Sequence, residues 1–110
     1  MSQDYDTKSQ VKKILKIVEQ IAPGKLVELR IPPYAAIQCV EGGNHRRGTP
    51  PNVVEMAGET LINLVKDPAK WEIFCNQGLI SASGTSSNLS HLFREVSKLM
   101  ESLNGGINGY

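Results

Sequence analysis

Two Pro-Pro pairs divide the middle of this chain into short extended segments. Proline fixes its own φ angle and removes a backbone donor, so Pro32-Pro33 and Pro50-Pro51 each force a strand to stop or turn at a sheet edge. In the first segment, Val27, Leu29 and Ile31 alternate with charged residues, which is the period of a half-buried strand. The sequence therefore predicts three neighbouring strands: Leu26–Ile31, Ala35–Val40 and Asn52–Met56.

Helical patterns lie on both sides of these strands. A capping box formed by Thr7 and Gln10 predicts the start of an amphipathic helix that ends at Pro23-Gly24. After the strands, a short helix is predicted from about Gly58. A second begins at Asp67-Pro68, where an N-cap residue precedes a proline at the first helical position.

The C-terminal helix has the clearest pattern in the chain. It follows a brief strand at 79–83 and a polar turn in which Ser87 or Asn88 is expected to cap it. Its apolar residues recur in the i, i+3, i+4, i+7 series: Leu89, Leu92, Phe93, Val96, Leu99, Met100 and Leu103.

This order of elements predicts an α+β fold, a mostly antiparallel sheet of about four to five strands covered by helices. A chain of 110 residues is long enough for one domain, so residues 1–110 are expected to form a single domain. The ends, 1–6 and 104–110, are expected to be flexible because they are polar or rich in glycine.

Composition argues against several classes of function. The formal net charge is +1, so no overall field favours nucleic acid. No apolar run approaches the roughly 20 residues that span a bilayer, so stable membrane insertion is not expected. No signal peptide is apparent, which leaves the cytoplasm as the expected location. Cys39 and Cys75 fall in predicted regular elements and are expected to be free thiols.

Several segments resemble the small bacterial orthologues of sterol carrier protein. The similarity covers roughly residues 8–93, and its motifs are Arg30-Ile31-Pro32-Pro33-Tyr34, Gln38-Cys39-Val40-Glu41-Gly42, His45, Arg47-Gly48-Thr49-Pro50-Pro51-Asn52-Val53-Val54-Glu55 and Ala82-Ser83-Gly84. The resemblance implies the sterol-carrier-protein-like fold. It also implies a non-catalytic carrier that binds a lipid or another hydrophobic small molecule between the sheet and the helices.

A set of apolar side chains on the covering helices could line such a pocket. These candidate ligand-binding residues are Leu61, Val65, Trp71, Phe74, Leu89, Leu92 and Phe93. The alternative is that the same side chains form a closed core, because every domain of this size needs one. Periodicity alone favours the core, because apolar stripes are common to all amphipathic helices, and only the family resemblance brings the pocket level with it.

The segment from Glu41 to Pro51 concentrates polar chemistry. His45, Arg46 and Arg47 stand beside glycines and could hold an anion or a protein partner together with Tyr34. The alternative interpretation is that the arginines pair with nearby glutamates and only pin the segment. A protein-interaction or regulatory module that uses this loop is therefore the second functional hypothesis.

An enzyme acting on an anionic small substrate is the weakest hypothesis. Cys39 with His45 could suggest a thiol nucleophile, but apolar neighbours in a strand raise a thiol pKa. The two histidines and two cysteines do not have the spacing of a zinc site. We therefore expect no catalytic residues, no metal and no cofactor.

Overall fold

The computed structural model describes the main chain of residues 3–42 and 52–108 and the side chains of residues 5–42 and 52–103. The elements, in chain order, are α1 (Gln3–Ile21), β1 (Val27–Ile31), β2 (Ala35–Cys39), β3 (Asn52–Met56), α2 (Gly58–Lys66), the 3-10 turn η1 (Pro68–Lys70), α3 (Trp71–Asn76), β4 (Ile80–Ser83) and α4 (Ser90–Asn108). Each strand lies within one residue of its predicted range.

The described strands form one sheet in the order β2-β1-β3-β4. β2 pairs with β1 and β4 pairs with β3, both antiparallel, whereas the central pair β1–β3 is parallel. In this register Leu29 lies beside Ile37 on one flank and beside Val54 on the other. The predicted α+β fold with a mostly antiparallel sheet is confirmed, and the parallel centre arises because β3 returns to the free flank of β1.

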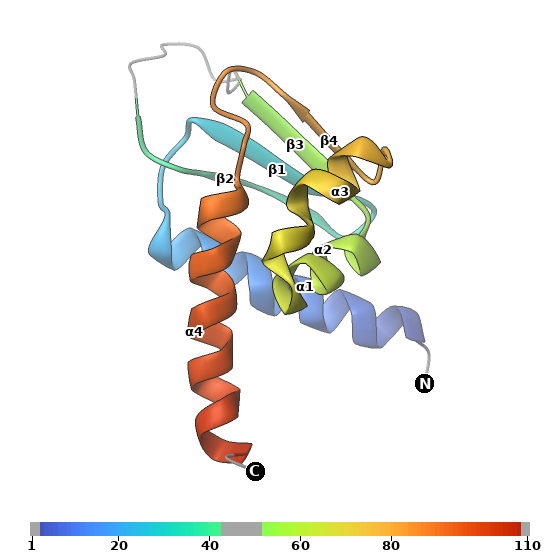
Figure 1. Ribbon diagram of the computed structural model, residues 1–110, viewed down its shortest axis with the longest axis vertical. Helices are drawn as coiled ribbons and strands as arrows, with labels where there is room; N and C mark the ends of the chain where they lie inside the picture. Colours follow the sequence, from blue (N-terminus) through green and yellow to red (C-terminus); the bar gives the residue numbers. More distant parts are fainter. Residues whose placement is uncertain (1–2, 43–51, 109–110) are drawn as a thin grey trace.

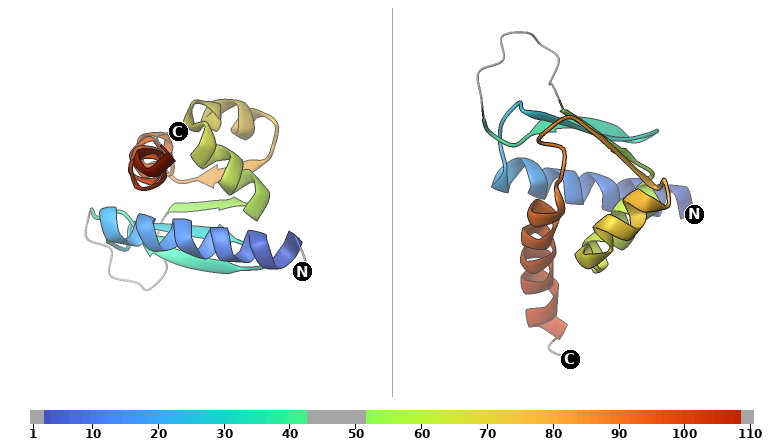
Figure 2. Two further views of the ribbon diagram at one scale, coloured as in Figure 1. Left: turned by 90° about the horizontal axis from the view of Figure 1, so that it is seen from below. Right: turned by 45° about the horizontal axis from the view of Figure 1, so that its top comes forward.

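All the helices cover one face of the sheet (Figure 1). The two further views show α1 running lengthwise along the strands, while the C-terminal part of α4 projects away from the sheet (Figure 2). On the face of the sheet that the helices cover, the side chains of Val27, Leu29 and Ile31 in β1 are fully buried, as the alternation predicted. The opposite face stays open. There the guanidinium group of Arg30 donates a hydrogen bond to the carboxylate of Glu28 at 3.3 Å and forms an ion pair with Glu55 at 3.8 Å. The hydrogen bond to Glu28 is the main reason that the pKa of Arg30 is raised.

Both long helices exceed their predicted limits. α1 begins at Gln3 rather than after Thr7, and within its first turns Gln10 donates a hydrogen bond to Asp6 at 3.2 Å, a spacing that supports a helix. α4 continues to Asn108 through a segment expected to lack regular structure. The main chain of residues 3–6 and 104–108 is therefore helical, as expected when an established helix extends at little cost per residue. The flexibility of the ends, 1–6 and 104–110, stays a prediction.

The end of α1 is tied to the end of β2. Val40 donates its N–H to the carbonyl of Ala22 at 2.7 Å and accepts a hydrogen bond from the N–H of Leu26 at 2.9 Å. Val40 has a φ of 68° and Gly24 a φ of 147°, and a Cβ at Gly24 would overlap the carbonyl of Val40. Only glycine fits this close approach.

A buried asparagine fixes the place where α4 begins. Asn52 is 2% exposed; it donates to the carbonyl of Leu26 at 3.0 Å and accepts from the N–H of Ser86 at 2.8 Å. Asn88 then accepts a hydrogen bond from the N–H of Ser90 at 2.9 Å and so satisfies one free donor at the start of α4. The N-cap position itself is Leu89, whose carbonyl accepts the hydrogen bond of Phe93, and not Ser87 or Asn88 as predicted. The position of α4 over the sheet therefore depends on Asn52.

Candidate functional site

Five of the seven predicted pocket residues lie in the closed hydrophobic core. They are Leu61, Val65, Trp71, Leu89 and Phe93, and each is at most 7% exposed. The rings of Trp71 and Phe93 stack with their centroids 6.4 Å apart. Here the predicted residues pack against one another, as the alternative of a closed core requires, so a ligand-binding role for them stays a prediction.

Phe74 and Leu92 lie at the margin of this core. Both are half-buried and pack against it. Leu92 differs from the other six because it also lines an open groove between the C-terminal end of α1 and α4. Of the seven predicted pocket residues, Leu92 is therefore the one that lines this groove.

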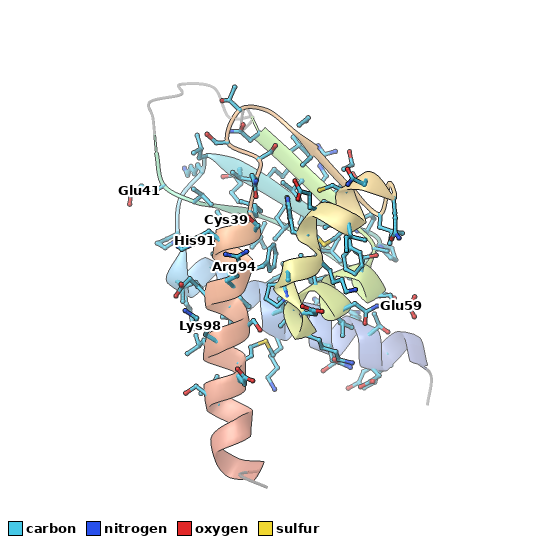
Figure 3. The ribbon with its side chains drawn as sticks, viewed as in Figure 1. Cys39, Glu41, Glu59, His91, Arg94 and Lys98 are labelled. Carbon is cyan, nitrogen blue, oxygen red and sulfur yellow. The ribbon has the colours of Figure 1, made fainter. Side chains whose placement is uncertain are left out.

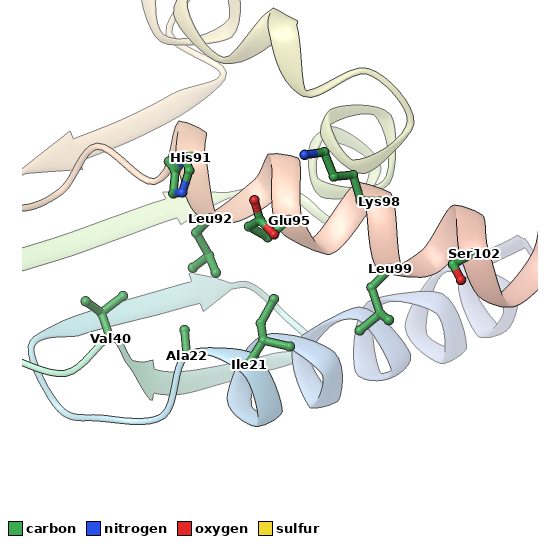
Figure 4. Close-up of a pocket in the computed structure, with 9 residues that line it drawn as sticks. All are labelled: Ile21, Ala22, Val40, His91, Leu92, Glu95, Lys98, Leu99 and Ser102. Carbon is green, nitrogen blue, oxygen red and sulfur yellow. The ribbon is translucent and has the colours of Figure 1, made fainter.

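This groove has a volume of about 640 Å³. The close-up shows α1 on one side and α4 on the other, with Val40 at one end (Figure 4). We call it the α1–α4 groove, and its lining residues are Ile21, Ala22, Val40, His91, Leu92, Glu95, Lys98, Leu99 and Ser102. Its size is that of a site for a small organic molecule.

The two sides of the groove differ in character. The side formed by Ile21, Ala22 and Val40 is apolar. On α4, Leu92 and Leu99 point toward these residues (Figure 4). Phe93 and Val96 of α4 are buried in the core, and Leu92 and Leu99 lie next to them on the helix surface. The apolar surface of α4 therefore extends beyond the core into the groove.

Polar residues complete the α4 side of the groove. His91, Glu95, Lys98 and Ser102 recur at intervals of four, three and four residues, and His91 and Lys98 can be followed along the helix in Figure 3. His91, Glu95 and Lys98 are exposed. Within the part of the chain that the structure describes, no hydrogen bond or ion pair of their side chains is found. They are therefore available to a ligand.

The predicted polar loop cannot be placed with these residues. His45, Arg46 and Arg47 lie outside the described residues. Tyr34 lies in the turn between β1 and β2, where a Cβ at Gly58 would come 2.9 Å from its ring. Tyr34 therefore packs on the first turn of α2.

Glu41, the first residue of the predicted loop, is remote from that turn. Tyr34 and Glu41 lie beyond opposite ends of β2, a five-residue strand about 17 Å long at 3.3 Å per strand residue. Glu59, which lines a pocket with Tyr34, and Glu41 lie on opposite sides of the molecule (Figure 3). A combined site of Tyr34 with the loop arginines stays a prediction.

The two cysteines are free, as predicted. Cys39 is fully buried, and burial, with a smaller effect of Glu19, raises its pKa to about 11. Burial, with a smaller effect of Glu72, also raises the pKa of Cys75. A protonated, buried thiol is a poor nucleophile. Among residues 3–42 and 52–108, no cluster of three or more potential metal ligands is present.

Sequence reasoning missed most of the groove. Ile21 is the last residue of α1 and is 39% exposed, and Val40 follows the last residue of β2. The available signals in the sequence were apolar residues at the ends of two predicted elements, Ile21 just before Pro23-Gly24 and Val40 at the end of the second strand. The periodicity of α4 included Leu99 but could not show which side of the helix leaves the core.

Comparison with known proteins adds the family context. A family model described as bacterial SCP ortholog matches residues 3–94. The match covers all the described strands and the start of α4, but Glu95, Lys98, Leu99 and Ser102 lie beyond it. No curated protein matches the chain. Within the described residues, none of the helices is long and apolar enough to cross a membrane.

Proposed function

Because this chain belongs to the family of bacterial SCP orthologs, we propose that it is a small lipid-carrier-like protein that binds an apolar or amphipathic molecule without changing it chemically. The observation that carries this proposal is the α1–α4 groove, with about 640 Å³ of space beside apolar side chains. The proposed site therefore lies between α1 and α4, not between the sheet and the helices of residues 58–77.

The groove is adequate for ligand binding on simple energetic grounds. Burying about ten methylene groups at roughly 0.8 kcal/mol each contributes some 8 kcal/mol. Ordering the ligand and losing its free motion offset part of this gain, so we expect a dissociation constant above about 1 μM, the value that roughly 8 kcal/mol would give. The apolar residues Ile21, Ala22, Val40, Leu92 and Leu99 would supply the contact surface.

The described titratable groups support a binding role over a catalytic one. Cys39 is buried and protonated, and it does not line the groove. His91 and Glu95 line the groove but are exposed, and neither is held by a hydrogen bond to another described residue. General acid–base chemistry requires such positioning.

The proposal is tested by titrating delipidated protein with a long-chain fatty acid and with a sterol. Binding should be saturable and should raise the melting temperature. Ala22→Phe fills the apolar side of the groove and should weaken binding at least tenfold, equivalent to about 1.4 kcal/mol. Ala36→Phe makes the same chemical change on the exposed face of β2 and serves as the matched control.

Emission from Trp71 distinguishes the two possible sites. Trp71 lies in the core against Phe93, so a ligand in the α1–α4 groove should leave its emission nearly unchanged. A ligand between the sheet and α2–α3 should alter it strongly. If no ligand of any chain length binds, the carrier proposal is wrong, and the partner-binding module that uses Glu41–Pro51 takes its place.

A further inference from the structure

The polar residues of the α1–α4 groove extend along its full length on α4. At 100° per residue, His91, Glu95, Lys98 and Ser102 fall within a wedge of about 60° of the helix. From the first to the last they span about 16 Å at 1.5 Å per residue. The polar side chains therefore run along the length of the groove and are not gathered at one end of it.

Among the residues that the structure describes, none on the opposite side of the groove carries a matching polar side chain. That side is formed by Ile21, Ala22 and Val40, and Leu92 and Leu99 project toward it from the α4 side (Figure 4). In cross-section the groove is thus apolar on one side and polar on the other.

A fatty acid or a simple sterol does not match this arrangement, because its polar group stands at one end. Such a ligand would cover Glu95 with hydrocarbon and remove water from its carboxylate without replacing the lost hydrogen bonds. A ligand with hydroxyl or amino groups along one edge would satisfy Glu95 and Ser102 and would still place its apolar face on Ile21, Ala22 and Val40.

We infer that the groove selects facial amphiphiles, meaning rigid, extended molecules that carry several hydroxyl or amino groups along one edge and hydrocarbon along the other. This inference rests on the proposed function and names its ligand class. The matched family region ends at residue 94, so Glu95, Lys98 and Ser102 are features for which the family match does not account.

The test compares two bile acids that share one skeleton and one carboxylate. Cholate carries three hydroxyl groups on one face and lithocholate carries only one, so lithocholate is the more hydrophobic. Calorimetric titration below the micelle-forming concentrations should show cholate binding about tenfold more tightly, from one or two hydrogen bonds to charged groups. Binding controlled by hydrophobicity alone gives the reverse order, and that result would overturn the inference.

Two variants locate the selectivity on the protein. Glu95→Leu should abolish the preference for cholate and strengthen lithocholate binding, because the bound ligand then covers a leucine instead of a carboxylate. Glu101→Leu makes the same change at an exposed position of α4 that does not line the groove and should leave the preference intact. Glu95→Gln, which keeps hydrogen bonding without charge, should retain part of the preference.

The outcomes also separate this inference from the proposed function. If lithocholate and fatty acids bind in a manner that Ala22→Phe prevents, but cholate has no advantage, the carrier function stands and the selectivity is wrong. The selectivity is also wrong if Glu101→Leu removes the cholate preference as fully as Glu95→Leu does. If none of these compounds binds, both proposals are wrong.

Discussion

The apolar stripe of α4 leaves the core partway along the helix, and this predicts a steep change in the cost of substitution. Val96 is fully buried, whereas Leu103, two turns later on the same stripe, is 54% exposed. Val96→Ala removes two carbon atoms from the core, about 1.6 kcal/mol of transfer free energy, and the remaining cavity raises the loss to about 2–3 kcal/mol. Replacing Leu103 removes more carbon atoms but should cost much less.

The expected loss for Leu103→Ala follows from its exposure. Three carbon atoms at about 0.8 kcal/mol each would contribute about 2.4 kcal/mol if fully buried, and roughly half of the side chain is in water. The better helix propensity of alanine returns a few tenths of a kcal/mol. The free energy of unfolding should therefore fall by no more than about 1 kcal/mol.

Equilibrium unfolding in urea measures both losses. Far-UV circular dichroism follows the helices, and emission from Trp71 follows the docking of α4 because its ring stacks on Phe93. The urea dependence should be the same for both variants. Equal losses would show that the distal half of α4 is covered in solution. A loss below about 1 kcal/mol for Val96→Ala would show that α4 is not part of the cooperative core.

Three further predictions concern the body of the domain. The pKa of Cys39 is raised to about 11 in the folded protein, so the stability from its neutral thiol is full below about pH 8.5 and is lost as the pH rises through 11. Relative to Cys39→Ala, the unfolding free energy of the unmodified protein should therefore fall by up to about 3 kcal/mol over that range, and parallel pH profiles would contradict the assignment. Asn52→Ala leaves the N–H of Ser86 without its acceptor and should cost about 2–4 kcal/mol by urea unfolding, whereas a loss under 1 kcal/mol would mean that water replaces the amide. Gly24→Ala should cost more than about 2 kcal/mol by the same measurement because its Cβ overlaps a main-chain carbonyl; Gly78→Ala, at a φ of 78° with open space around it, should cost only about 1–2 kcal/mol, and equal costs would argue against the overlap.

Local patterns predicted the elements well. The alternation of Val27, Leu29 and Ile31 identified β1 and its buried face, and the restart at Asp67-Pro68 marked η1. These features depend on neighbours in the sequence, which a single sequence displays directly.

Contacts between distant segments could not be predicted in the same way. The parallel pairing of Val27 with Asn52 depends on how the chain returns to β1, and no local pattern encodes it. The groove posed the same difficulty. Leu92 and Phe93 are adjacent in one apolar series, yet Phe93 is fully buried and Leu92 lines the groove. Adjacent residues of a helix point about 100° apart, so Phe93 faces the core while Leu92 faces the end of α1.

The strand order has a consequence for how the protein assembles during synthesis. The segment up to Met56 holds α1, β1 and both of the strands that pair with β1, which are β2 and β3. A nascent chain can therefore join β2, β1 and β3 on α1 before α2 to α4 exist, and domains do form from the N-terminus as they are made. Until β4 arrives, β3 presents an unpaired edge, and hydrophobic side chains such as Val54 and Met56 lack their covering helices. The interval between synthesis of β3 and docking of α4 is thus the stage at which this chain is most exposed to aggregation.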